Sequence, residues 1–152
     1  MTRINVGIKP ENLTDQHLVA ELRELPRIFT AVRKRIAEGK SFDDIPDTFR
    51  LGSGHVKFFY DKIEYLIWRH DLLRQEYLKR FKKEWSYIVE IKDKEELFAL
   101  NRLNLAQGYR YTQKDRQLLI DRISERIIGS NQKPRYYGKE IRKREAIENL
   151  KR

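Results

Sequence analysis

Residues 15–36 of the chain read DQHLVAELRELPRIFTAVRKRI, and this stretch decides the fold because its apolar side chains recur every three or four residues. The recurring positions are Leu18, Leu22, Leu25, Phe29, Val32 and Ile36. This spacing predicts an amphipathic helix whose apolar stripe packs into the core, with Asp15 as its N-cap. Pro26 lacks a backbone donor and is expected to kink or interrupt the helix just after Glu24.

The polar face of the same helix gathers cations and amides around one acid. On a helical wheel its members are Gln16, His17, Ala20, Arg23, Glu24 and Arg27. A solvated charged face with a structural proline is the commoner explanation for any single helix, and it stays open here. The excess of cationic side chains around Glu24 favours a functional carboxylate instead.

A second, long helix is predicted after a loop over residues 39–54. Apolar residues step by three and four from residue 56 to residue 77, at Val56, Phe59, Ile63, Leu66, His70, Leu73 and Tyr77. Core packing is preferred to base stacking for four aromatic side chains of this region, which are Phe58, Phe59, Tyr60 and Trp68.

A third main helix opens at Thr112 and Asp115, which have the spacing of a capping box, and ends at Gly129. Its apolar stripe is Leu118, Leu119, Ile123 and Ile127. On this helix Arg122 and Arg126 lie four residues apart, so both side chains can contact phosphates of the same nucleic-acid strand. The alternative for both arginines is surface salt bridging, to Asp121 and Glu125.

The remaining segments give weaker patterns. Residues 87–91 are either extended or loop, and residues 93–105 are expected to form a short helix that Gly108 ends as a C-cap. Residues 140–152 either form a helix or remain mobile. Together these patterns predict an all-α fold, a single compact domain of about three main helices with long irregular loops.

Composition indicates a polyanionic partner. The chain has 33 Lys and Arg against 23 Asp and Glu, a net charge of +10 in 152 residues, which favours phosphate binding that weakens as salt rises. Membrane binding is the competing explanation, but no apolar run of about 18 residues and no signal-peptide pattern is visible, so a soluble intracellular protein is expected.

Cysteine is absent, which excludes disulfides, thiol chemistry and the usual cysteine-containing zinc sites. The three histidines, His17, His55 and His70, show no metal-ligand spacing with one another. We therefore expect metal-free catalysis without a cofactor.

The amino terminus offers a nucleophile. Removal of Met1, which the small neighbour Thr2 permits, would leave an α-amine beside a basic surface. An α-amine titrates near pKa ~7.7–8.0 against ~10.4 for lysine, so roughly a tenth of it is neutral at pH 7. An ordinary frayed terminus is the alternative, and it is the commoner outcome for a random chain.

Several ordered strings carry a resemblance to a known family. They are Met1-Thr2-Arg3-Ile4-Asn5, Asp15-Gln16-His17-Leu18, Ala20-Glu21-Leu22-Arg23-Glu24-Leu25-Pro26-Arg27, Leu51-Gly52-Ser53-Gly54-His55-Val56-Lys57-Phe58-Phe59-Tyr60-Asp61-Lys62 and Tyr136-Tyr137-Gly138-Lys139. In these strings the chain resembles the pyrimidine dimer DNA glycosylases of T-even bacteriophage, the phage endonuclease V family. The resemblance is close over residues 1–83 and loose over 108–141, whereas residues 84–107 and the tail beyond Ile141 do not match.

The resemblance implies a metal-free repair enzyme that acts as a monomer on damaged double-stranded DNA. After base flipping, the Thr2 amine would displace a base of the dimer and form an imine with the sugar, and β-elimination would then cut the strand. Glu24 would stabilise the cationic intermediate and move protons. Residues 1–141 would form this glycosylase and lyase domain, with residues 142–152 as a charged extension.

The resemblance also implies a set of DNA-binding residues. Those on or near the first helix are Arg3, Gln16, His17, Arg23 and Arg27; those nearer the carboxyl end are Arg122, Arg126, Tyr136 and Tyr137. For one of the two tyrosines, packing is the more natural role.

Three alternatives stay open. The same imine chemistry could serve abasic sites or other damaged bases, because the middle of the chain departs from the family. The chain could also be a non-catalytic basic DNA-binding protein, which would gain weight if Met1 stays attached. An RNA-binding role ranks third, since no RNA module pattern is visible.

Overall fold

The computed structural model describes residues 4–152, so the predictions for Thr2 and Arg3 lie outside the described residues. Within this range the chain forms six α-helices, one short 3-10 helix and two short strands. The α-helices are α1 (Asp15–Ala37), α2 (His55–Phe58), α3 (Ile63–Phe81), α4 (Lys94–Arg102), α5 (Gln113–Gly129) and α6 (Lys143–Leu150). The 3-10 helix is Pro10–Asn12, and the strands are β1 (Arg135–Tyr136) and β2 (Lys139–Glu140).

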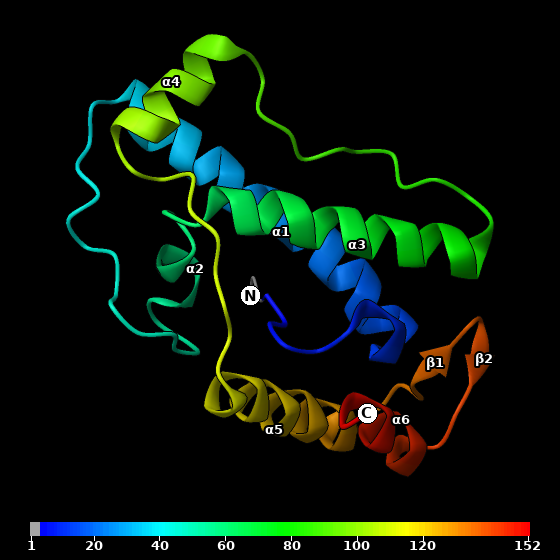
Figure 1. The fold of residues 1–152 in the computed structure, drawn as a ribbon. Coiled ribbons are helices and arrows are strands. Elements are labelled where there is room, and N and C mark those ends of the chain that lie inside the picture. The colour runs from blue at the N-terminus through cyan, green and yellow to red at the C-terminus, as the bar shows by residue number, and fades with distance from the viewer. Residues whose placement is uncertain (1–3) are drawn as a thin grey trace.

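The predicted all-α class is confirmed in broad terms, and the three longest helices are the three expected ones. In Figure 1, α3 crosses in front of α1, while α5 and α6 lie side by side below them. The strands β1 and β2 form an antiparallel hairpin in which Arg135 lies opposite Glu140. No helix within residues 4–152 has the length and apolar character that crossing a membrane requires.

The apolar stripe of α1 is confirmed as core, since Leu18, Leu22 and Leu25 are fully buried. The prediction of Asp15 as the N-cap is wrong. The N-cap is Thr14, whose hydroxyl accepts a hydrogen bond from the backbone N–H of His17 at 3.2 Å. Asp15 is instead the first helical residue, where its carboxylate is free to accept bonds from other parts of the fold.

A kink or an interruption was predicted at Pro26, and the interruption does not occur, because α1 runs through this residue. A proline cannot donate to the carbonyl four residues earlier, which here belongs to Leu22. The ring of His70, which projects from α3, donates a hydrogen bond to that carbonyl. A side chain from a neighbouring helix therefore replaces the donor that Pro26 lacks.

The second predicted helix is divided in the structure. It forms the single turn α2 and the long α3, with a break over residues 59–62. The break occurs because this segment pairs with a distant one: the N–H of Ile63 donates to the carbonyl of Leu105, and the N–H of Gln107 donates to the carbonyl of Asp61. Core packing is confirmed for three of the four aromatic residues in this region, and Trp68 is the exception because it is exposed.

The segments after α3 follow the predictions in part. Residues 87–91 are loop, α4 ends at Arg102, and the left-handed residue behind it is Asn104 rather than Gly108, so the predicted glycine cap is wrong. The capping box at Thr112 is confirmed. Helix α6 packs against α5 and buries Leu150.

Candidate active site

The segment that begins at Ile4 is attached to the rest of the fold by hydrogen bonds from its backbone and its side chains. The backbone N–H of Ile4 donates to Nε2 of His55 at 2.9 Å, and Nδ1 of His55 lies 2.9 Å from the carbonyl oxygen of Arg50. The Nδ2 amide of Asn5 donates to the Glu21 carboxylate at 2.8 Å. Since Nε2 of His55 accepts, its ring proton lies on Nδ1 and is directed to Arg50. Ile4 and Asn5 are both buried, so this segment has a fixed position against α1.

Beneath this segment lies a buried ion pair. The Glu21 carboxylate on α1 accepts two hydrogen bonds from the Arg69 guanidinium on α3, at 2.8 and 3.0 Å. The same guanidinium donates to the carbonyl of Ile8 at 2.8 Å. Burial alone would lower the pKa of Arg69, but the Glu21 carboxylate reverses this effect and holds the pKa above its ordinary value.

Sequence reasoning missed both members of this pair. Glu21 stands beside Leu22 and Leu25, at the edge of the apolar stripe, and a charge in that position indicates a buried partner. This signal was available in the sequence. The sequence did not identify Arg69 as the partner, because that pairing depends on how α1 and α3 pack.

Glu24 has a different setting three residues further along α1. Its side chain is 20% exposed, and it pairs with Arg27, which is 70% exposed, at 2.9 Å. Arg23 is exposed on the same helix. The structure thus brings three of the predicted residues together on one open face: a partly exposed carboxylate and two arginines.

A hollow of about 360 Å³ joins the start of α1 to the end of α5. Gln16, His17 and Arg126 line it, together with Pro134. The Gln16 amide is engaged at both ends, since Nε2 donates to the carbonyl of Lys133 and Oε1 accepts from the N–H of Arg135, each at 2.9 Å. Gln16 therefore holds the loop that leads into β1, a structural role that the sequence did not reveal.

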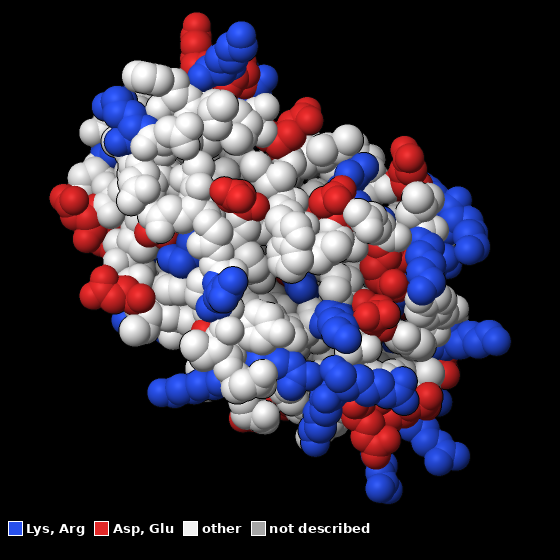
Figure 2. Space-filling model, in the orientation of Figure 1, with Lys and Arg blue, Asp and Glu red and all other residues white. Residues whose placement is uncertain are grey.

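Nδ1 of His17 lies 2.7 Å from the Thr14 hydroxyl, so the same N-cap residue contacts both the backbone and the ring of His17. On α5, Arg122 lies 3.7 Å from Glu125, a contact that matches the salt-bridge alternative. Arg126 is exposed at the hollow. In Figure 2, lysine and arginine side chains project densely over the lower part of the molecule, where Figure 1 places α5 and α6.

Tyr136 and Tyr137 pack against a second buried arginine. The guanidinium carbon of Arg80 lies 4.8 and 4.9 Å from the centres of their rings. The Tyr136 hydroxyl donates to the carbonyl of Glu11 at 2.9 Å, and the Tyr137 hydroxyl donates to Glu76 at 3.0 Å. Burial and the Glu76 carboxylate both raise the pKa of Tyr137, so its hydroxyl remains a donor. Both tyrosines thus have packing roles.

Arg80 connects the hairpin to the start of α1. Its guanidinium donates to Asp15 at 2.9 Å and to Glu76 at 2.9 Å. The Asp15 carboxylate also accepts from the N–H groups of Tyr137 and Gly138, at 3.1 and 2.8 Å. Sequence reasoning missed Arg80, because nothing in the periodicity of α3 marks it as the centre of a network.

Among residues 4–152, no group of three or more His, Asp or Glu side chains is arranged to hold a metal ion. Six of the predicted site residues form two clusters: Arg23, Glu24 and Arg27 along α1, and Gln16, His17 and Arg126 at the hollow. Arg122, Tyr136 and Tyr137 belong to neither cluster.

A model of the family described as pyrimidine dimer DNA glycosylase matches residues 1–87, which is more than half of the 152-residue chain. The matched part contains all of α1, the buried Glu21–Arg69 pair and His55, whereas α5 and the β-hairpin lie beyond it. The chain therefore belongs to the pyrimidine dimer DNA glycosylase family.

Proposed function

We propose that this protein excises ultraviolet-induced pyrimidine dimers from double-stranded DNA and then cuts the strand by β-elimination, through an imine formed by the Thr2 amine. The family supports pyrimidine dimer glycosylase activity in general and therefore a DNA substrate. Our proposal goes beyond the family in three respects: the lyase step, the imine and the roles of single residues.

The observation that carries the proposal is the hydrogen bond between Asn5 and Glu21, because it fixes the N-terminal segment to α1 beside Glu24. Glu24 follows Glu21 by three residues, which is about 4.5 Å along the helix axis. Thr2 precedes Ile4 by two residues, so its Cα can lie no further than roughly 7 Å from that of Ile4. This short connection supports our assignment of the Thr2 amine as the nucleophile that acts beside Glu24.

The reaction begins when the neutral Thr2 amine attacks C1′ of the 5′ sugar of the dimer. The new C–N bond forms as the glycosidic bond breaks, and the departing base keeps the electron pair and takes up a proton. Loss of the amine protons and opening of the sugar ring give the imine. Removal of a proton from C2′ then expels the 3′ phosphate as an anion.

Glu24 has two roles in this scheme. Its carboxylate stabilises the positive charge that develops on the sugar and the imine, and it carries protons between C2′, the sugar oxygen and the amine. Partial exposure suits both roles, because the carboxylate can turn from Arg27 toward the substrate. Arg27 then becomes available to a phosphate.

The arginines supply the phosphate contacts. Arg23 and Arg27 on α1 and Arg126 on α5 are exposed, and the chain carries a net charge of +10. We assign phosphate contacts to these three residues, with Arg3, His17 and Arg122 beside them. Gln16, Tyr136 and Tyr137 act through the loop and hairpin that they hold, which place the surface next to the lesion strand.

Borohydride trapping tests the proposal. Reduction should convert the imine into a stable covalent complex between protein and dimer-containing duplex. Two preparations, checked by mass, are compared: chain that begins at Thr2 and chain that keeps Met1. We expect trapping only with the first, since Met1 displaces the amine from its position. Absence of trapping with the processed chain would remove the imine mechanism, and equal trapping by both chains would transfer it to a lysine.

A further inference from the structure

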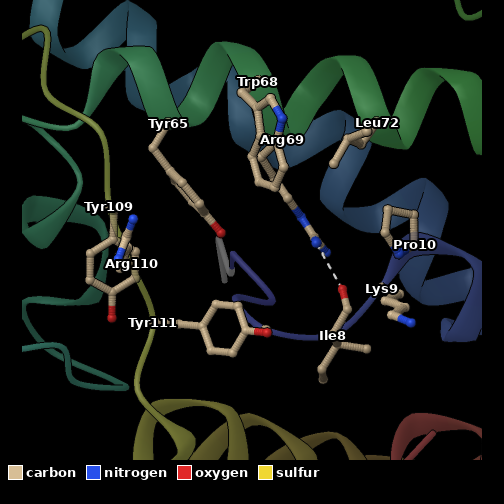
Figure 3. Close-up of a pocket in the computed structure, with 11 residues that line it drawn as sticks. Ile8, Lys9, Pro10, Tyr65, Trp68, Arg69, Leu72, Tyr109, Arg110 and Tyr111 are labelled. Carbon is tan, nitrogen blue, oxygen red and sulfur yellow. Dashed lines mark hydrogen bonds between the residues drawn. The ribbon is translucent and has the colours of Figure 1, made fainter.

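A second hollow, of about 390 Å³, shares no described lining residue with the hollow at the start of α1. Three segments line it: residues 7–10, the α3 residues Tyr65, Trp68, Arg69 and Leu72, and residues 109–111 before α5. None of its lining residues belongs to α1. Figure 3 shows Tyr65, Trp68 and Arg69 descending from α3 toward Tyr111, which approaches from the opposite side. The volume is in the range of small-molecule sites.

Aromatic rings form the walls of this pocket. The Tyr65 and Trp68 rings have centroids 5.8 Å apart, and the Tyr109 ring meets Tyr65 edge-on at 5.4 Å. Trp68 is 57% exposed and Tyr111 is 45% exposed. Two large rings that remain open to solvent at the edge of one hollow offer stacking surfaces to a flat ligand.

Gly7 allows this wall to form. It has φ +74, and a Cβ built on it would lie 2.8 Å from the Tyr111 ring and 2.9 Å from Cβ of Arg116. Only glycine lets the Tyr111 ring lie this close to the main chain in that backbone conformation. The Arg116 side chain donates to the carbonyl of Gly7 at 3.0 Å, which holds the segment from the other side.

Charge decides what kind of flat ligand fits. Lys9 and Arg110 are exposed lining residues, Arg69 is a buried one, and no acidic residue among residues 4–152 lines the pocket. Aromatic cages also bind organic cations, but Lys9 and Arg110 oppose that choice, whereas Glu21 balances the charge of Arg69. Burial raises the pKa of Tyr65 to about 12, so its phenol stays a neutral hydrogen-bond donor. A planar, anionic ligand satisfies both the rings and the charges.

We propose that this pocket binds a nucleotide, with its base stacked on Trp68 and Tyr111 and its phosphate held by Arg110, while Lys9, at the other end of the pocket in Figure 3, adds positive charge. The nucleotide is either a free nucleoside monophosphate or an unpaired nucleotide of a DNA strand. Base stacking on aromatic side chains together with cation contacts to the phosphate is the general chemistry of single-strand recognition. Among residues 4–152, the lining of this pocket includes none of the residues to which we assign repair chemistry.

Tryptophan fluorescence provides the test. The chain has two tryptophans, so Trp85→Phe leaves Trp68 as the single reporter inside the pocket. Adenosine and thymidine monophosphates and a thymidine tetranucleotide are titrated, with adenosine and inorganic phosphate for comparison. We expect saturable quenching by the nucleotides, at least tenfold weaker binding after Arg110→Gln, and unchanged binding after Arg142→Gln, a matched exposed arginine before α6.

The pattern of binding identifies the source of the ligand. Equal affinity for the monophosphates and the tetranucleotide indicates a free nucleotide, while saturation by the tetranucleotide alone indicates an unpaired strand. Quenching that stays linear in concentration for every probe would overturn the proposal. So would a loss of affinity in Arg27→Ala as large as that in Arg110→Gln, because the nucleotide would then bind on α1. Both arginines are exposed, so these variants test binding rather than folding.

Discussion

Glu21 and Glu24 lie three residues apart on α1, and each pairs with an arginine, yet their settings differ. The Glu21 side chain is fully buried with Arg69, which is 4% exposed, and Asn5 completes the set of hydrogen bonds. Glu24 is partly open to solvent, and its partner Arg27 extends from the surface. One helix thus carries a carboxylate that joins three segments of the fold and another that can change partners.

Burial is the property that separates these two acids. An exposed ion pair contributes about 0–1 kcal/mol, so Arg27 can leave Glu24 for a phosphate at little cost. Breaking a buried pair by removing one partner costs about 3–5 kcal/mol, so Arg69 cannot be exchanged in the same way. The chemistry proposed for Glu24 depends on this contrast.

The largest expected effect concerns the buried pair. Arg69→Met should lower the free energy of unfolding by about 3–5 kcal/mol, because Glu21 and the carbonyl of Ile8 lose their donor inside the core. Arg27→Met is the matched control and should cost about 1 kcal/mol or less. Urea unfolding followed by circular dichroism measures both. Similar losses in the two variants would abolish the contrast between the pairs.

A smaller loss is expected at His70, on the buried side of α1. His70→Leu leaves the carbonyl of Leu22 without a donor and should cost about 1–3 kcal/mol. In the double variant Pro26→Ala/His70→Leu, the new backbone N–H can reach that carbonyl, so part of the loss should return. The cycle is measured by urea unfolding at pH 7. Strict additivity of the two substitutions would show that His70 does not replace the missing donor.

The same residue predicts a pH dependence. Burial lowers the pKa of His70 below its ordinary value of 6.5, and the bond to Leu22 only partly opposes this. The unfolded chain therefore takes up the proton at higher pH than the folded chain. The stabilisation from His70 is complete above pH 6.5 and is lost as the pH falls below it. The free energy of unfolding should drop more steeply from pH 6.5 to 5 in the wild type than in His70→Leu, and equal slopes would contradict this.

The smallest expected effect is at Arg27 itself. Arg27→Ala should weaken binding to duplex DNA and reduce the slope of log affinity against log salt by about one. Arg144→Ala removes another exposed arginine with a carboxylate one turn away, at 3.2 Å, and should leave the slope unchanged. Fluorescence anisotropy over a salt series gives both slopes. An unaltered slope in Arg27→Ala would deny it a phosphate contact.

The fold was predictable where the signal is local. The stripes that mark α1, α3 and α5 depend only on the spacing of apolar residues, and so does the capping box at Thr112. The break before Ile63 was not predictable, because it arises from pairing with Leu105, some forty residues away. The hydrogen bond from His70 to the carbonyl of Leu22 was likewise not predictable, because no local pattern connects these two residues.

In the candidate site, too, the residues marked by a local pattern were predictable and those that depend on long-range contacts were not. The polar face of α1 follows from the helical wheel, so Glu24 and its arginines could be grouped from sequence. The hydrogen bonds of Gln16 could not be predicted, since its partners are Lys133, in the loop before β1, and Arg135, the first residue of β1. Arg80 gives no periodic signal either, because its importance comes from two tyrosine rings and two carboxylates that meet only in the folded chain.

The central claim, that Glu24 performs chemistry on a helix whose neighbouring acid holds the scaffold, is tested most directly by Glu24→Gln. Strand cleavage of ultraviolet-irradiated plasmid is measured alongside duplex binding and urea unfolding. We expect unfolding and binding close to those of the wild type and cleavage reduced by about 100-fold or more. Cleavage at the wild-type rate by a folded Glu24→Gln protein would contradict the claim.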